Sequence, residues 1–141
     1  MQTYRASHPR GYGSVRAARR ALSAFAAGCG FCGAALSDVE SAIGEALANA
    51  AEHGDRECST GVDVAATFDG TRLVIEIQDH GTGFDCNAAL ERSGRQPPGN
   101  SVRGFGIFLM RTLMDEVAYS ERGSRIQLVK RLDTRTAVSA R

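Results

Sequence analysis

Three short motifs follow one another along the chain and together restrict what it can fold into. An acid and an amide, Glu45 and Asn49, stand four residues apart in a stretch with helical periodicity. A strand-like run then ends in an Asp-x-Gly-x-Gly segment that begins at Asp79, and a Gly-x-Gly pair beginning at Gly104 opens another helical stretch. Each motif is weak alone. A helix face, a strand end and a helix start in this order predict one nucleotide site in an α/β domain.

The length and composition of the chain restrict the class of protein to which it can belong. At 141 residues with 43% hydrophobic content, the chain predicts one compact domain over residues 1–132 and a disordered tail over 133–141. No apolar run approaches the roughly 20 residues that cross a bilayer, and the start lacks a signal-peptide core. We therefore expect a soluble, cytoplasmic protein without a membrane partner. A net charge of +1 gives no case for direct nucleic-acid binding.

The hydrophobic periodicity alternates between the helix and strand types. It predicts strands at 2–7, 62–68, 73–79, 117–120 and 124–132, and helices at 15–27, 38–53 and 104–115. We expect Ser14 and Ser37 to cap the first two helices, with Gly54 just past the end of the second. Asp69 and Gly70 are typical of a tight hairpin turn between two strands.

The pair Glu45 and Asn49 projects from one face of its helix because the two residues are four apart. An amide oxygen beside a carboxylate suits a hard cation such as Mg²⁺, and the carboxylate stays available as a base. Taken alone, the pair fits an ordinary solvated helix face better. The pair therefore indicates a nucleotide site only in combination with the other two motifs.

The two glycine motifs favour a base and a phosphate chain as ligands. Asp79 follows an apolar strand and can accept a hydrogen bond from an exocyclic amine such as that of adenine, while Gly81 and Gly83 let the backbone come close. A plain Asp-Gly turn is an equally good explanation of that segment alone. Gly104 and Gly106 at a helix start expose backbone N–H groups to an anion. No Lys-Ser or Lys-Thr follows them, which excludes a P-loop.

The full series of motifs resembles a known superfamily. Glu-x-x-x-Asn-Ala-x-x-His-Gly, Asp-x-Gly-x-Gly and Gly-x-Gly, followed by Met-Asp-Glu-Val at 114–117, is similar to the Bergerat-fold (GHKL) ATPases. That last segment and Arg19 resemble more narrowly the anti-sigma factor serine/threonine-protein kinases of bacteria. The similarity covers about residues 3–132. It implies a two-layer α+β sandwich, with a mixed, mostly antiparallel sheet and about three helices on one face.

The resemblance also implies a role for each matching residue. Glu45 would act as the base on the attacking hydroxyl, and Asn49 would hold Mg²⁺. Asp79 would bind the adenine amine. The remaining assignments are a pocket shaped by Gly81 and Gly83, phosphates cradled by Gly104 and Gly106, a lid over residues 86–103, and a positive charge on the phosphates from Arg103 in that lid.

The function implied by the resemblance is partner switching. Such a protein binds ATP and Mg²⁺, sequesters a sigma factor, and phosphorylates a serine or threonine of a small anti-anti-sigma protein of the STAS type. The family commonly forms homodimers through its sheet. Three alternatives remain open from the sequence: a sequestering module without catalysis, the ATP-binding subunit of a histidine-kinase-like system, and a small housekeeping ATPase.

A Cys-x-x-Cys segment, Cys29 to Cys32, lies outside the family pattern. Redox-active versions normally begin a helix after a strand, whereas this one follows a helix. A zinc site would need two more ligands, and Cys58, Cys86 and His53 contain no second closely spaced pair. We expect structural thiols.

Overall fold

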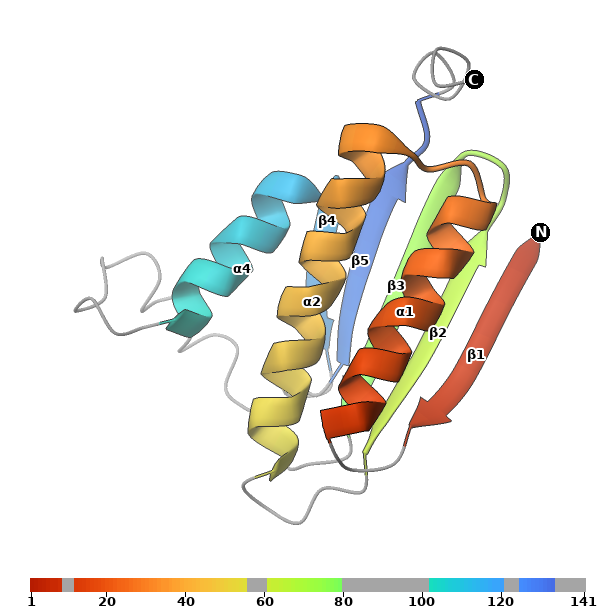
Figure 1. Ribbon diagram of the computed structural model, residues 1–141. Helices are drawn as coiled ribbons and strands as arrows, with labels where there is room; N and C mark the ends of the chain where they lie inside the picture. Colours follow the sequence, from red (N-terminus) through yellow and green to blue (C-terminus); the bar gives the residue numbers. More distant parts are fainter. Residues whose placement is uncertain (9–11, 56–60, 80–101, 121–124, 134–141) are drawn as a thin grey trace.

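The computed structural model describes residues 1–8, 12–55, 61–79, 102–120 and 125–133, which form three helices and five strands (Figure 1). The elements in chain order are β1 (Gln2–His8), α1 (Tyr12–Gly28), α2 (Gly33–Asp55), β2 (Val62–Phe68), β3 (Arg72–Asp79), α4 (Val102–Leu113), β4 (Glu116–Ser120) and β5 (Arg125–Arg131). None of the described helices combines the length and the apolar character needed to cross a bilayer.

The five strands form one sheet in the order β1-β2-β3-β5-β4. Each of the four pairings is antiparallel, so the expected mostly antiparallel sheet is antiparallel throughout its described strands. Figure 1 shows all three helices on the same side of this sheet, with α2 between α1 and α4. The predicted two-layer α+β architecture with three helices on one face is confirmed.

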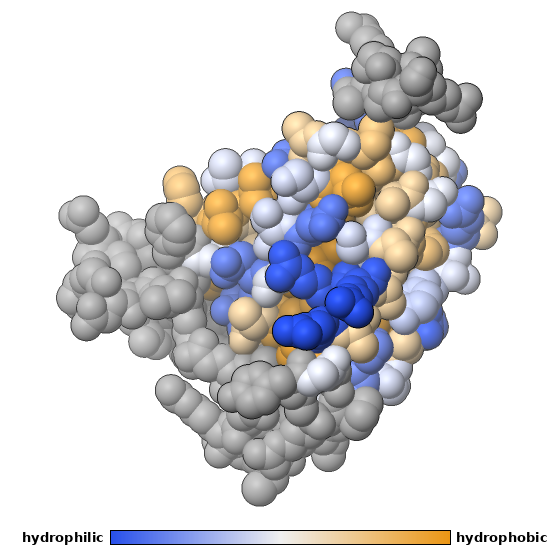
Figure 2. Space-filling view, viewed as in Figure 1, coloured by the Kyte–Doolittle hydropathy of each residue, from blue (hydrophilic) through white to orange (hydrophobic). Residues whose placement is uncertain are grey.

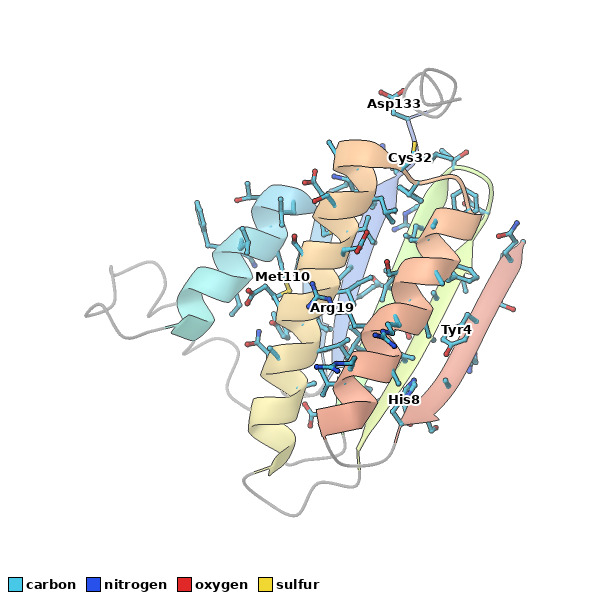
Figure 3. The ribbon with its side chains drawn as sticks, viewed as in Figure 1. Tyr4, His8, Arg19, Cys32, Met110 and Asp133 are labelled. Atoms are coloured by element: carbon cyan, nitrogen blue, oxygen red, sulfur yellow. The ribbon has the colours of Figure 1, made fainter. Side chains whose placement is uncertain are left out.

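The core lies between the sheet and the helices. Period-2 alternation on β3 buries Leu73, Ile75 and Ile77 against the helical layer. From that layer α2 contributes Ile43 and Leu47, each fully buried, and Figure 3 shows Met110 of α4 beside α2. Burial of each such side chain contributes about 1.5–3 kcal/mol, so the core determines where α2 and α4 lie.

The hairpin turn between β2 and β3 is the one that the sequence predicts. Asp69 Oδ1 accepts hydrogen bonds from the backbone N–H groups of Arg72 and Thr71, at 2.7 and 2.9 Å, and these bonds lower the pKa of the carboxyl group. Gly70 has a φ of 104°, a conformation that L side chains rarely adopt. The turn therefore sets the register in which β3 delivers Asp79 to its end.

The helix starts differ from the predictions. The helix α2 begins at Gly33, where the carbonyl of Cys32 accepts the N–H of Leu36 at 3.3 Å, and Ser37 lies inside the helix instead of capping it. Ser14 likewise lies within α1, and Gly54 within the last turns of α2. The strong helix formers Ala and Leu before residue 37 extend α2 backward past the serine.

The segment predicted to be a lid, 86–103, lies outside the described residues except for its last two positions. Those two, 102 and 103, belong to the first turn of α4, so Arg103 begins a helix and is not part of a loop. At the other end α4 stops at Leu113: the N–H of Met114 still donates to the carbonyl of Met110 at 2.9 Å, but that of Asp115 donates instead to the carbonyl of Val129 on β5 at 2.8 Å. The predicted domain of residues 1–132 stays a prediction, and of the predicted tail only Asp133 is described.

Candidate functional site

The helices α2 and α4 meet at Glu45 and Gly106. A Cβ atom placed on Gly106 would lie 2.8 Å from Glu45 Oε2, closer than real side chains come, so the carboxylate occupies the space that a side chain at 106 would take. Gly106 is itself buried within α4. The structure therefore brings the first and third sequence motifs into direct contact and places a carboxylate one turn from the start of α4.

Asn49 lies one turn after Glu45 on the same side of α2, and both side chains are half-buried. Neither residue is enclosed in the core. Among the described residues no group of three or more His, Cys, Asp or Glu side chains is placed to hold a metal ion. The amide and the carboxylate still fit Mg²⁺, because this ion takes one or two protein oxygens and completes its shell with water and phosphate.

Asp79 ends β3 and is only 4% exposed, which makes it the one charged side chain in the buried class within the described part of the chain. Asp79 lies on the same face of β3 as Ile75 and Ile77, because side chains two residues apart in a strand point the same way, and it therefore faces the helical layer. A buried carboxylate is costly to desolvate and is usually retained for a specific interaction. Asp79 thus has the position expected of a ligand-binding group at a strand end.

Two further predicted site residues, Gly81 and Gly83, lie outside the described residues. Arg103 and Gly104 belong to the first turn of α4, where backbone N–H groups have no partner inside the helix. That turn contains no acidic residue that would repel an anion. Of the eight predicted site residues, the structure places the side chains or glycines of Glu45, Asn49, Asp79 and Gly106 in the helical layer or facing it.

A second close approach was not predicted from the sequence. A Cβ atom on Gly44 would lie 3.4 Å from Cζ of Arg19, so the guanidinium group covers this glycine across the gap between α1 and α2. Figure 3 shows Arg19 at that boundary, and the glycine that it covers directly precedes Glu45 in α2. A glycine in the middle of a helix is the signal that could have indicated the contact, because alanine would be more favourable there by about 1 kcal/mol.

The Cys-x-x-Cys pair has the environment of structural thiols. Both cysteines are free, and Cys29 is buried with its thiol donating to Oε1 of Gln2 at 3.2 Å. Burial raises the pKa of the Cys29 thiol, which is the opposite of what a reactive cysteine needs. Cys58 and Cys86 lie outside the described residues. The expectation of structural thiols fits Cys29.

Comparison with known families decides which ATP-binding fold this is. The profile of the histidine kinase-like ATPase domain matches residues 9–130. The chain belongs to this family. The resemblance to the GHKL ATPases that the three motifs indicate is therefore confirmed.

Similar proteins include serine-protein kinases named RsbW. The protein of Listeria monocytogenes is 29% identical over 123 residues, which cover 82% of this chain and 78% of that protein. The protein of Bacillus subtilis is 32% identical over 105 residues, covering 70% of this chain and 66% of that protein. The sequence therefore resembles serine-protein kinases over most of its length.

A solved structure supports the fold. The crystal structure of the SiaB-SiaC complex from Pseudomonas aeruginosa contains a chain that matches with a TM-score of 0.58 and 15% identity. The match covers 92% of this chain and 88% of that chain. At this identity the likeness shows a shared fold, which agrees with the three helices on an antiparallel sheet described above.

The contact at Gly106 predicts a non-additive response to substitution. Gly106→Ala should stabilise α4 by about 1 kcal/mol in a Glu45→Ala background, because alanine favours a helix interior. In the wild type the gain should be smaller or reversed, since the new methyl group displaces the Glu45 carboxylate. Urea denaturation of the four proteins measures the difference.

The matched control is Gly13→Ala in α1, where a Cβ atom would meet nothing within 4 Å. Gly13→Ala should change the free energy of unfolding equally in the wild type and in the Glu45→Ala background. Equal effects of Gly106→Ala in the two backgrounds would contradict the contact.

Proposed function

We propose that this protein is a serine/threonine kinase that transfers the γ-phosphoryl group of ATP to an anti-anti-sigma protein of the STAS type, and that it sequesters a sigma factor by partner switching in the cytoplasm. The observation that carries the proposal is the contact between the Glu45 carboxylate and Gly106. This contact leaves a carboxylate, the proposed base, one turn from the start of α4, whose free N–H groups would suit phosphate oxygens. The names of the similar proteins, which are serine-protein kinases, support the reaction type.

In the proposed reaction Glu45 takes the proton of a serine or threonine hydroxyl on the partner. The hydroxyl oxygen then bonds to the γ-phosphorus while the bond from that phosphorus to the β,γ-bridging oxygen breaks, which leaves ADP. Phosphoryl transfer needs little covalent chemistry from the protein, because most of the acceleration comes from positioning and from positive charge around the phosphates. The contact of half-buried Glu45 with α4 would hold its carboxylate in place for this step.

The other site residues bind and orient the nucleotide in this proposal. Asn49 would hold Mg²⁺, which neutralises charge on the phosphates when it is bound. Asp79, buried at the end of β3, would accept a hydrogen bond from the adenine amine. The N–H groups of the first turn of α4, which includes Gly104, would bind phosphate oxygens, with Arg103 in the same turn supplying positive charge. Gly81 and Gly83 would line the adenine end.

The exposed face of α1 is the proposed partner surface. Arg16, Arg19 and Arg20 are all exposed there, and α1 contains no acidic residue. Figure 2 shows strongly hydrophilic side chains gathered in the middle of the helical side, where Figure 1 places α1 and α2. Because Arg19 also covers Gly44, next to Glu45, a partner with an acidic surface would bind close to the base.

The open face of the sheet is the proposed homodimer interface. It contains a hollow of about 500 Å³ lined in part by Arg5, Asp63, Glu76 and Arg125, around the small side chain of Ala65. Both signs of charge occur in this lining, so acidic and basic side chains of two copies could pair across a two-fold axis. These side chains alternate with the helix-facing core residues, so a dimer through this face would leave the nucleotide site free.

Nucleotide binding and catalysis should separate at Glu45 and Asn49. Mg-ATP should raise the Tm of the wild type, because a ligand at about 100 times its Kd adds about 2.7 kcal/mol to the stability of the folded state. Glu45→Gln should keep this shift and lose phosphorylation of the partner by at least about a hundred-fold, since a general base contributes that much. Asn49→Ala should reduce the part of the shift that depends on Mg²⁺.

Thermal shift with ATP and with Mg-ATP, followed by phosphotransfer assays on candidate STAS proteins, measures these effects. Absence of any shift in the wild type would contradict the nucleotide site, and equal phosphotransfer by Glu45→Gln would contradict the base.

Reversal of charge on α1 should weaken partner binding. Arg19→Glu should raise the Kd for the anti-anti-sigma protein by at least about ten-fold, because a like charge would then face the acidic partner. Arg111→Glu, at an exposed arginine on α4, is the matched control and should change the Kd little. Titration calorimetry measures both, and equal losses at the two positions would argue for a general charge effect.

The dimer should dissociate when the centre of the open sheet face is filled. Ala65→Arg places a long charged side chain in the hollow and should shift the mass measured by light scattering from two chains to one. Ala24→Arg on the exposed side of α1 is the control and should leave the mass unchanged. A wild-type mass of one chain would overturn the dimer.

A further inference from the structure

Lys130 links three elements through one amino group. It lies on β5, with the parity of the helix-facing Ile126 and Leu128, and its side chain is 17% exposed. Its Nζ donates to the backbone carbonyl of Leu113, the last residue of α4, at 2.5 Å, and lies 3.6 Å from Oδ2 of Asp38 on α2. The same group therefore connects the sheet, the end of α4 and the first half of α2.

The bridge made by Lys130 and the Glu45–Gly106 contact lie at matching distances along α2 and α4. Asp38 precedes Glu45 by two turns of α2, and Leu113 follows Gly106 by two turns of α4, so each helix is held at two points about 10.5 Å apart. The helices α2 and α4 run in opposite directions, as Figure 1 shows, which makes these two pairs of positions face each other. A change in the distance between Asp38 and Leu113 would therefore change the distance between Glu45 and Gly106.

We propose that Lys130 is a positioning residue that holds α4 against α2 and thereby keeps the Glu45 carboxylate at Gly106. The inference rests on the proposed role of Glu45 as the base. Lys130 does not touch the reacting groups in this proposal. Loss of its bridge would let the two helices shift slightly, and a displacement of about 1 Å at the base is enough to slow a reaction that depends on positioning.

The chemistry of lysine fits this position. The ammonium group carries three donors on a compact head, so it can bond to a carbonyl at the negative end of a helix and to a carboxylate in another direction. The planar fork of arginine is larger and cannot be expected to serve both partners. Lys130 is the one lysine among the 17 lysine and arginine residues of the sequence.

Other bonds attach α4 to the sheet without reaching α2. Beyond the helix, the N–H of Asp115 donates to the carbonyl of Val129 at 2.8 Å, and Asp115 Oδ2 accepts the N–H of Arg131 at 2.6 Å. These bonds secure the end of α4 on β5 but leave its distance from α2 undetermined. Asp115 therefore provides a matched control in which a bond at the same end of α4 is removed while the Lys130 bridge stays.

The test compares Lys130→Met and Asp38→Asn with Asp115→Ala. Methionine keeps most of the aliphatic stem of lysine, and Asp38→Asn removes only the charge on α2. Each variant is measured for its folded fraction by circular dichroism, for Mg-ADP affinity, for the amide resonances of Glu45 and Gly106 by NMR, and for the kcat of phosphotransfer from Mg-ATP to the partner protein that the wild type phosphorylates.

Lys130→Met and Asp38→Asn should shift the Gly106 amide resonance and lower kcat by at least about five-fold, while the Kd for Mg-ADP changes by less than about two-fold, because positioning of the base acts on the chemical step. Asp115→Ala should lower the Tm without either effect. If Lys130→Met fails to fold, the Gly106 resonance and kcat of Asp38→Asn test the proposal.

An unchanged Gly106 resonance and kcat in folded Lys130→Met or Asp38→Asn, or equal effects from Asp115→Ala, would overturn the proposal. A wild type that phosphorylates no partner would instead contradict the proposed function. In that case the resonances alone decide whether Lys130 sets the distance between α2 and α4.

Discussion

The structure depends on how closely α2 approaches α4. At Gly106 the approach leaves no space for a side chain, because the Glu45 carboxylate already lies 2.8 Å from where a Cβ atom would stand. A single packing constraint therefore determines both the crossing of two helices and the location of an acid beside a helix start. Because the core under α2 and α4 is closely packed and buried, it limits this distance to small adjustments, within which the contacts between the two helices set its value.

The sheet completes the arrangement by keeping the two layers separate. Its antiparallel strands alternate apolar side chains toward the helices with mostly polar ones toward the open face, and β3 delivers the buried Asp79 to the helical side. The proposed nucleotide site and the proposed dimer interface thus lie on opposite faces. The arginines of α1 lie on the helical side, so a partner that binds them would reach Glu45 without disturbing the open face.

The strands could be predicted from the sequence more accurately than the helix ends. The predicted strand 62–68 is the observed β2, and β3 begins one residue earlier than expected, because strict alternation and the turn at Asp69 leave one register. The cap predictions were wrong because both serines lie inside helices: Ala34, Ala35 and Leu36 extend α2 past Ser37, whereas α1 starts two residues before Ser14 with no such run of helix formers. For the candidate site, the residue types and the elements that carry Glu45, Asn49, Asp79 and Gly106 could be predicted, whereas Gly81 and Gly83 lie outside the described residues.

The sequence by itself determined the chemistry available to this protein and the order in which helix, strand end and helix start present it. These are local properties, set by periodicity, turn residues and side-chain type within a few positions. Only the tertiary structure decided that Glu45 meets Gly106, that Arg19 covers Gly44 and that Lys130 joins α4 to Asp38. Each of these contacts joins different elements, and their distances follow from how the helices pack on the sheet, a property of the whole core that no local pattern specifies.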